Sequence, residues 1–151
     1  MVYERMLNIA EKENISVKEA DLRLYDGVIK GRKVAIRRNM TRREKACVLS
    51  EEIGHSKRSS GNILDYSKNA KQEADARLVG YDLLVGLEGI VKAYNAGCRN
   101  LYEMADYLEV TECFLKEAID RYRGKYGLYA SCGEYCVIFE PTLAVMRKIG
   151  G

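Results

Sequence analysis

The chain has 151 residues, of which 47% are hydrophobic and 31% are charged, and it contains a single proline. This composition is that of a globular protein with one core, and it excludes a disordered or fibrous chain. The formal net charge is only +3, from 25 basic and 22 acidic residues, so direct nucleic-acid binding is not expected. No window of about 18 apolar residues is present, so we expect no membrane-spanning segment.

The cysteines and the N-terminal residues indicate the compartment. There are five cysteines, an odd number, and Met1–Arg5 contain no apolar run like that of a signal peptide. We therefore expect a cytoplasmic chain with reduced thiols. Cys132 and Cys136 have a spacing close to that of zinc-knuckle pairs, but a matching second pair is missing. The thiols are best interpreted as small buried hydrophobic side chains.

The N-terminal part predicts an amphipathic helix followed by a small antiparallel sheet. Apolar residues recur at helical spacing at the start of the chain, and short apolar runs separated by glycine follow. The expected elements are a helix over 2–14, extended structure over 15–24 with a turn at 26–27, and a hairpin-like strand pair over 28–30 and 34–37.

The next helix carries the most informative motif of the chain. The tetrapeptide Thr41-Arg42-Arg43-Glu44 is a capping box, which predicts a helix running to about Lys57. Within it, residues 51–55 read Glu-Glu-Ile-Gly-His, one substitution from the H-E-x-x-H signature. In that signature, residues four apart on one helix face hold a zinc ion, and the glutamate between them is a general base. Here these positions are occupied by Glu51, His55 and Glu52.

Two further observations qualify the motif. Glutamate is itself a zinc ligand, so Glu51 still offers a donor to a metal ion. The alternative is an exposed Glu51–His55 pair that only supports the helix, by about 0.2–0.5 kcal/mol. Gly54 has no packing role that the sequence reveals, yet glycine costs about 1 kcal/mol against alanine in a helix. A close neighbouring backbone that needs the room is one candidate explanation.

The C-terminal part predicts helices followed by a short hairpin. Asn100 and Thr111 are suitable N-caps, and the break at residues 109–110 indicates a helix-turn-helix-like corner. Its second helix carries both acidic and basic residues, which suits a protein partner better than phosphate. The expected elements are a long helix over 69–96 in which Gly80, Gly86 and Gly89 are bends or breaks, helices over 101–108 and 112–124, and a strand pair around 132–133 that reaches 137–139.

With these elements in place, the chain resembles the ImmA/IrrE family of metallo-endopeptidases, whose members occur beside regulators in phages and mobile elements. The resemblance covers most of the chain. It is carried by the residues 33–39 that end the sheet, the helix with Leu49–His55, the segment 59–65 that follows, and the long helix containing Glu73–Arg77. It implies an α+β fold with a zincin-like core over 1–97 and a helical corner and hairpin over 98–151, packed as a single structural unit.

The resemblance also implies a third zinc ligand on the helix after the motif. Asp75-Ala76-Arg77, followed by Leu83-Leu84, is similar to the family pattern, so this role is carried onto Asp75. Glu73 is the alternate, because residues two apart face different directions on a helix and only one is expected to point at the ion. The chain departs from the family pattern at Glu51, at the aspartate in place of glutamate, and at Arg77 in place of asparagine.

The expected function follows from this resemblance. It implies a cytoplasmic zinc-dependent endopeptidase that cleaves a repressor-like regulatory protein. Zinc is bound by Glu51, His55 and Asp75, and Glu52 activates water as the catalytic base. The alternative is a catalytically impaired family member that binds a regulatory protein without cleaving it. Bound zinc and Glu52-dependent cleavage distinguish these two hypotheses.

Overall fold

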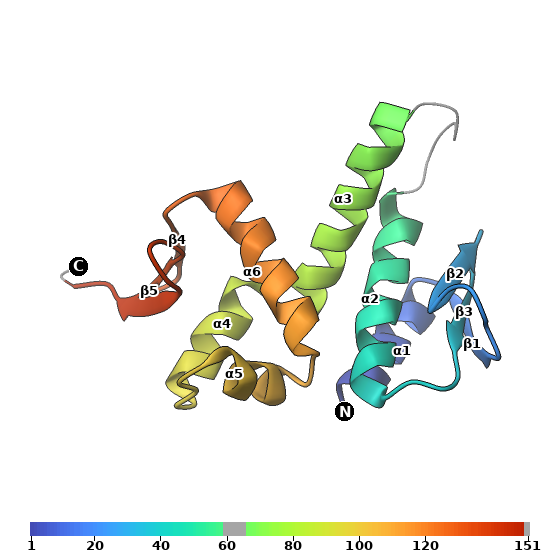
Figure 1. Ribbon diagram of the computed structural model, residues 1–151, viewed down its shortest axis with the longest axis horizontal. Coiled ribbons are helices and arrows are strands. Elements are labelled where there is room, and N and C mark those ends of the chain that lie inside the picture. The colour runs from blue at the N-terminus through green and yellow to red at the C-terminus, as the bar shows by residue number, and fades with distance from the viewer. Residues whose placement is uncertain (59–65, 150–151) are drawn as a thin grey trace. The chain divides into compact units, whose positions relative to one another are not determined.

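A computed structural model describes residues 1–58 and 66–149 (Figure 1). Helices and two small sheets form an α+β fold, which confirms the predicted class. The chain divides into two compact units, Met1–Leu84 and Val85–Gly151, whereas the sequence predicted a boundary between residues 97 and 98. That the two parts form a single structural unit stays a prediction. No helix of the described ranges has the length and apolar character needed to cross a membrane.

The first unit contains a mixed sheet and three helices. In chain order the elements are α1 (Val2–Lys12), β1 (Ser16–Ala20), β2 (Gly27–Lys30), β3 (Lys33–Arg37), α2 (Arg42–Arg58) and α3 (Tyr66–Leu84). Strands β2 and β3 form the predicted antiparallel hairpin through a two-residue turn, in which Gly31 has a φ of +62°. The sheet order is β1-β3-β2, with β1 parallel to β3. The expected antiparallel sheet is therefore extended by one parallel strand.

The second unit contains three helices and an antiparallel sheet. Its elements are α4 (Gly86–Asn95), α5 (Leu101–Leu108), α6 (Glu112–Tyr126), β4 (Tyr129–Cys132), β5 (Tyr135–Ile138) and β6 (Ala144–Arg147). Both predicted N-caps are confirmed, because the Asn100 side chain accepts from the Glu103 N–H and the Thr111 hydroxyl accepts from the Phe114 N–H. The late strand pair gains a third strand, since β6 pairs with β5.

The long helix predicted over 69–96 is two helices. Helix α3 ends at Leu84, and α4 begins at Gly86 after a residue with non-helical dihedral angles. Gly86 has a φ of +65°, a left-handed conformation that glycine adopts without the steric cost of a side chain. One of the three glycines singled out by the sequence therefore begins α4 directly after the break, and the division between the two units falls just before it, between Leu84 and Val85.

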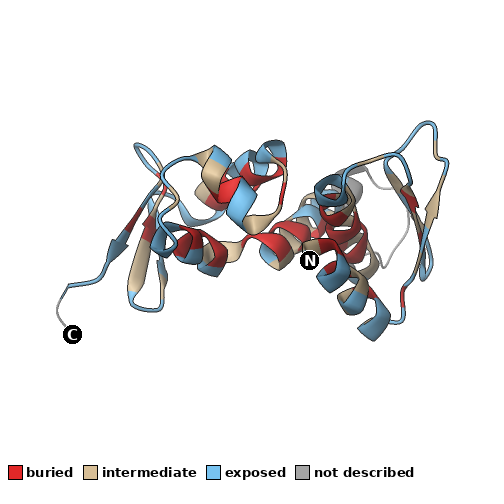
Figure 2. Ribbon diagram, turned by 90° about the horizontal axis from the view of Figure 1, so that it is seen from below, coloured by how far each residue is buried: buried red, intermediate tan, exposed pale blue. Residues whose placement is uncertain are grey.

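Each unit has its own apolar core. In the first unit the core includes Met6, Val34, Ile36, Leu49 and Ile53, and in the second it includes Ile90, Leu115, Tyr122, Val137 and Phe139. Buried positions, red in Figure 2, alternate with less buried ones along β3 and recur along the helices. These are the periods expected of a strand and of helices that cover one face. Helix α2 lies in the centre of the first unit, in contact with α1, α3 and the sheet.

Candidate active site

The motif helix α2 crosses α3 with backbone in contact with backbone. A Cβ atom added at Gly54 would lie 2.0 Å from the carbonyl oxygen of Ala76, and one at Gly80 would lie 3.0 Å from the hydroxyl of Ser50. Ser50 and Gly54 are four residues apart, as are Ala76 and Gly80, so each pair forms a stripe of small residues on one helix face. The close neighbouring backbone suggested for Gly54 is therefore α3.

The side-chain hydroxyl of Ser50, which lies in this crossing, has a hydrogen-bond partner. Ser50 is fully buried, and its hydroxyl donates a hydrogen bond of 2.7 Å to the carbonyl oxygen of Cys47 in the preceding turn. A buried hydroxyl without a partner would destabilise the fold by about 1–3 kcal/mol. Because backbone contacts cannot shift as flexible side chains can, the residues that flank the stripe are held in a fixed register.

Glu52 lies on the side of α2 that faces strand β2. Its side chain is 8% exposed, and a Cβ atom added at Gly27 would lie 3.4 Å from its Cγ. The same added atom would lie 2.5 Å from Val48 Cγ1. The glycine at the start of β2 therefore makes room for Val48, and it lies in contact with the Glu52 side chain between helix and sheet, which partly shields Glu52 from bulk water.

His55 meets a carboxylate from α3, and that carboxylate belongs to Glu73. The His55 Nε2 atom lies 3.4 Å from Glu73 Oε1, and Arg77 Nε lies 3.7 Å from the same oxygen. Asp75, the first choice from sequence, makes no ion pair with His55 among the described residues, 1–58 and 66–149. Two residues along a helix turn the side chain by about 200°, so only one of the two carboxylates faces α2 at this level. The structure brings the alternate, Glu73, to the histidine.

The carboxyl group of Glu52 is an unusually weak acid. Burial, and to a smaller extent the negative charges of Glu51 and Glu73, together raise the pKa of Glu52 to about 7. A carboxyl group that gains and loses its proton near neutral pH is suited to general acid and base chemistry. These effects also place Glu51, Glu52 and Glu73 in one electrostatic neighbourhood.

The donors of this neighbourhood fit a metal ion in part. Two ligands of a tetrahedral zinc ion lie about 3.3 Å apart, given metal–ligand distances of about 2.0–2.1 Å. The 3.4 Å between His55 and Glu73 matches that spacing. Within residues 1–58 and 66–149, however, no group of three or more His, Cys, Asp or Glu side chains is arranged to hold a metal ion. Glu51 lies four residues before His55, so it belongs to the same face of α2 as the histidine.

Sequence reasoning singled out Glu51, Glu52 and His55, but it did not identify the residues that position them. Gly27 and Gly80 were not singled out as contacts of the site, although both make room beside it. The available signal was the matching spacing of small residues, Ser50 with Gly54 and Ala76 with Gly80, on consecutive helices. The segment 59–65 that contributed to the family resemblance lies outside the described residues.

Comparison of the chain with family models, curated proteins and solved structures gives no match. The resemblance to the ImmA/IrrE family therefore rests on the motifs of the sequence itself. The function has to be argued from the geometry of Glu51, Glu52, His55 and Glu73.

Proposed function

We propose that this chain is a cytoplasmic zinc-dependent endopeptidase whose site is formed by α2 and α3. The observation that carries the proposal is the His55–Glu73 pair, which spans two helices at metal-ligand spacing, close to the buried carboxyl group of Glu52. If the His55–Glu73 pair were only a stabilising surface ion pair, it would need neither the close backbone contact of α2 with α3 nor a buried glutamate beside it. The substrate class, a repressor-like regulatory protein, comes from the family resemblance.

In this proposal His55, Glu73 and Glu51 would hold the zinc ion. When bound, the ion would make a water molecule more acidic and would polarise a carbonyl group. Glu52 would act as the base, because its carboxylate can accept a proton and return it to the leaving amine, a task that suits a group with a pKa of about 7. Its position between α2 and β2 restricts access of other water molecules.

Strand β2 offers a place for the substrate backbone. Among residues 1–58 and 66–149, the sheet order β1-β3-β2 gives β2 a single neighbour, so one edge of this strand has backbone groups without a sheet partner there. An extended peptide that adds to such an edge gains main-chain hydrogen bonds irrespective of its sequence. Gly27, the residue of β2 beside Glu52, would bring that peptide close to the base.

The second candidate function is a protein-binding regulator that keeps the fold without cleavage. It is favoured by one observation, that the described residues contain no preformed group of three metal donors. A shell with one imidazole and two carboxylates also carries more negative charge than a shell with two imidazoles and one carboxylate. The added charge weakens the effect by which a metal ion lowers the pKa of its bound water. The two candidates differ in metal content.

The test is the zinc content of the tag-free protein, measured by elemental analysis after zinc supplementation and desalting. We expect about one zinc ion per chain in the parent, in Glu52→Gln and in Asp75→Asn, and almost none in His55→Ala and Glu73→Gln. The pair Glu73→Gln and Asp75→Asn is matched, because both remove one charge from α3. Equal loss of zinc in Asp75→Asn would return the ligand role to Asp75. Little zinc in every protein would support the regulator.

A further inference from the structure

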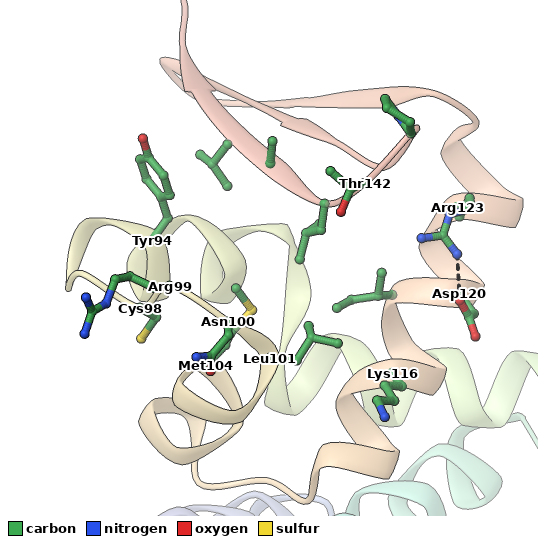
Figure 3. A pocket seen from close by; sticks show the side chains of 15 residues that line it. Tyr94, Cys98, Arg99, Asn100, Leu101, Met104, Lys116, Asp120, Arg123 and Thr142 are labelled. Carbon is green, nitrogen blue, oxygen red and sulfur yellow. Dashed lines mark hydrogen bonds and ion pairs between the residues drawn. The ribbon is translucent and has the colours of Figure 1, made fainter.

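The second unit contains a cavity of about 800 Å³ that the proposed catalytic site does not use (Figure 3). Its walls come from the end of α4 and the turn to α5, from α5, from one side of α6, and from the chain that leads into β6. Ligand sites typically have volumes of about 300–1,000 Å³ and an apolar lining with a few polar groups. The apolar lining here consists of Leu101, Met104, Ile119, Leu143 and Val145.

The charged side chains of the lining leave one cation without a counterion. Arg123 lies 2.7 Å from Asp120 and 2.9 Å from Glu140, so its charge is neutralised within the unit. Arg99 is at the rim, with a largely exposed side chain 3.8 Å from Glu103. Lys116, which lies on the α6 side in Figure 3, has no ion pair in the part of the chain that the structure describes. The cavity therefore combines an apolar floor with a free ammonium group.

The start of strand β6 borders the cavity. Pro141–Leu143 lead into this strand, and its first two residues, Ala144 and Val145, both line the cavity. Neighbouring side chains of a strand point to opposite faces, so two consecutive lining residues mean that the backbone of the strand borders the cavity. In the part of the chain that the structure describes, β6 pairs with β5 alone, so its other edge has backbone groups that are available to a further strand.

We propose that this cavity binds an extended acidic peptide of a partner protein. The peptide adds to the edge of β6, places an apolar side chain over Leu101, Met104 and Ile119, and brings a carboxylate to Lys116. An apolar floor with a single free cation suits such a peptide better than a nucleic acid, which needs several cations along its phosphates. All lining residues belong to the second unit, so the proposal does not depend on the proposed protease activity.

The experiment uses the full chain and fluorescence polarisation. The probe is a fluorescein-labelled hexapeptide of alternating leucine and glutamate, blocked at both ends, and the reference probe has lysine in place of glutamate. The test variant is Lys116→Glu, and the matched control is Arg121→Glu, which makes the same charge change at an exposed position of α6 outside the cavity. Circular dichroism checks that each variant folds.

We expect the glutamate peptide to bind the parent and Arg121→Glu with equal affinity, and Lys116→Glu about tenfold more weakly. A second variant, Leu143→Asp, should weaken binding of the same peptide because it places a carboxylate in the apolar lining. The proposal is overturned if the lysine peptide binds as well as the glutamate peptide, or if Lys116→Glu binds like the parent. Absence of binding to the parent, or displacement by an oligothymidylate of equal charge, would also overturn it.

Discussion

The two units differ in how their helices pack, and the difference matches two kinds of site. In the first unit, α2 and α3 meet through Gly54 and Ala76, with backbone in contact with backbone. In the second unit, α4, α5 and α6 surround a cavity with the strand β6 as one wall. A backbone contact fixes the separation of the side chains that flank it, whereas a cavity leaves space between its walls that a ligand can fill. A catalytic site needs side chains at fixed separations, which the backbone contact provides. A binding site needs space for a ligand, which the cavity provides.

The largest expected effect comes from Gly54→Ala. The added Cβ atom would overlap the Ala76 carbonyl oxygen, so the two helices must separate, at a cost of about 3 kcal/mol despite the better helix propensity of alanine. The matched control is Gly124→Ala on α6, where an added Cβ atom meets nothing within 4 Å and the protein should gain about 0.5–1 kcal/mol. Urea denaturation measures both. Equal stability of Gly54→Ala and the parent would show that the crossing is not tight.

The second prediction concerns pH and Glu52 in metal-free protein. Its pKa is about 7 in the folded chain and about 4.5 in the unfolded chain, so between these values the unfolded state has lost a proton that the folded state retains. The free energy of unfolding therefore falls as pH rises from about 4.5 to 7, by up to about 3 kcal/mol, and levels off above this range.

Glu52→Gln should remove this fall, and the mutant should be more stable than the parent at pH 8. Urea denaturation at several pH values, in the presence of a chelator, gives the comparison. The control is Glu11→Gln, at an exposed position of α1, whose profile should follow that of the parent. If the free energy of unfolding of Glu52→Gln falls with pH by as much as that of the parent, a group other than Glu52 causes the fall.

A smaller effect is expected at Glu19 on β1. Its carboxylate accepts hydrogen bonds from Lys45 and from the Tyr3 hydroxyl, each at 2.9 Å, and these contacts lower the pKa of Glu19. The resulting stability is present above the unfolded pKa of about 4.5 and is lost as pH falls through the lower folded value. Glu19→Gln should cost about 1 kcal/mol at pH 7. Asp21→Asn, which breaks an exposed ion pair with Arg38, should cost less than about 0.5 kcal/mol. Thermal denaturation measures both variants.

An effect smaller than that of Glu19→Gln is expected at Gly89 on α4. An added Cβ atom would lie 3.3 Å from Leu108 Cδ2, the end of a flexible side chain that can move by a few tenths of an ångström. Gly89→Ala should therefore change the stability by less than about 1 kcal/mol, in contrast to Gly54→Ala. If differential scanning calorimetry shows equally large losses for both variants, the distinction between the two units fails.

The sequence predicted local structure well where one turn of chain suffices to specify it. The capping box is present, with the Glu44 N–H donating to the Thr41 hydroxyl at 3.1 Å and the Thr41 N–H donating to the Glu44 carboxylate at 3.3 Å. The α5–α6 corner is also present, and Glu109 ends α5 in a left-handed conformation. Both features depend on hydrogen bonds between residues a few positions apart.

The same local rules were insufficient for contacts between elements. The sequence could not identify the partner of the late strands, which is β6, or the parallel pairing of β1 with β3. It predicted one helix over 69–96, since the apolar period continues through the break at Gly86. A period of 3.6 residues specifies a face but not where the chain turns.

The candidate site divides in the same way. The spacing of Glu51, Glu52 and His55 on one helix is a property of the sequence, and so is the need for room at Gly54. That Glu73 meets His55, and that Glu52 is buried with a raised pKa, were decided by the tertiary structure. The physical reason is that the register between α2 and α3 is set by the contact of their backbones, which the order of residues along either helix does not contain.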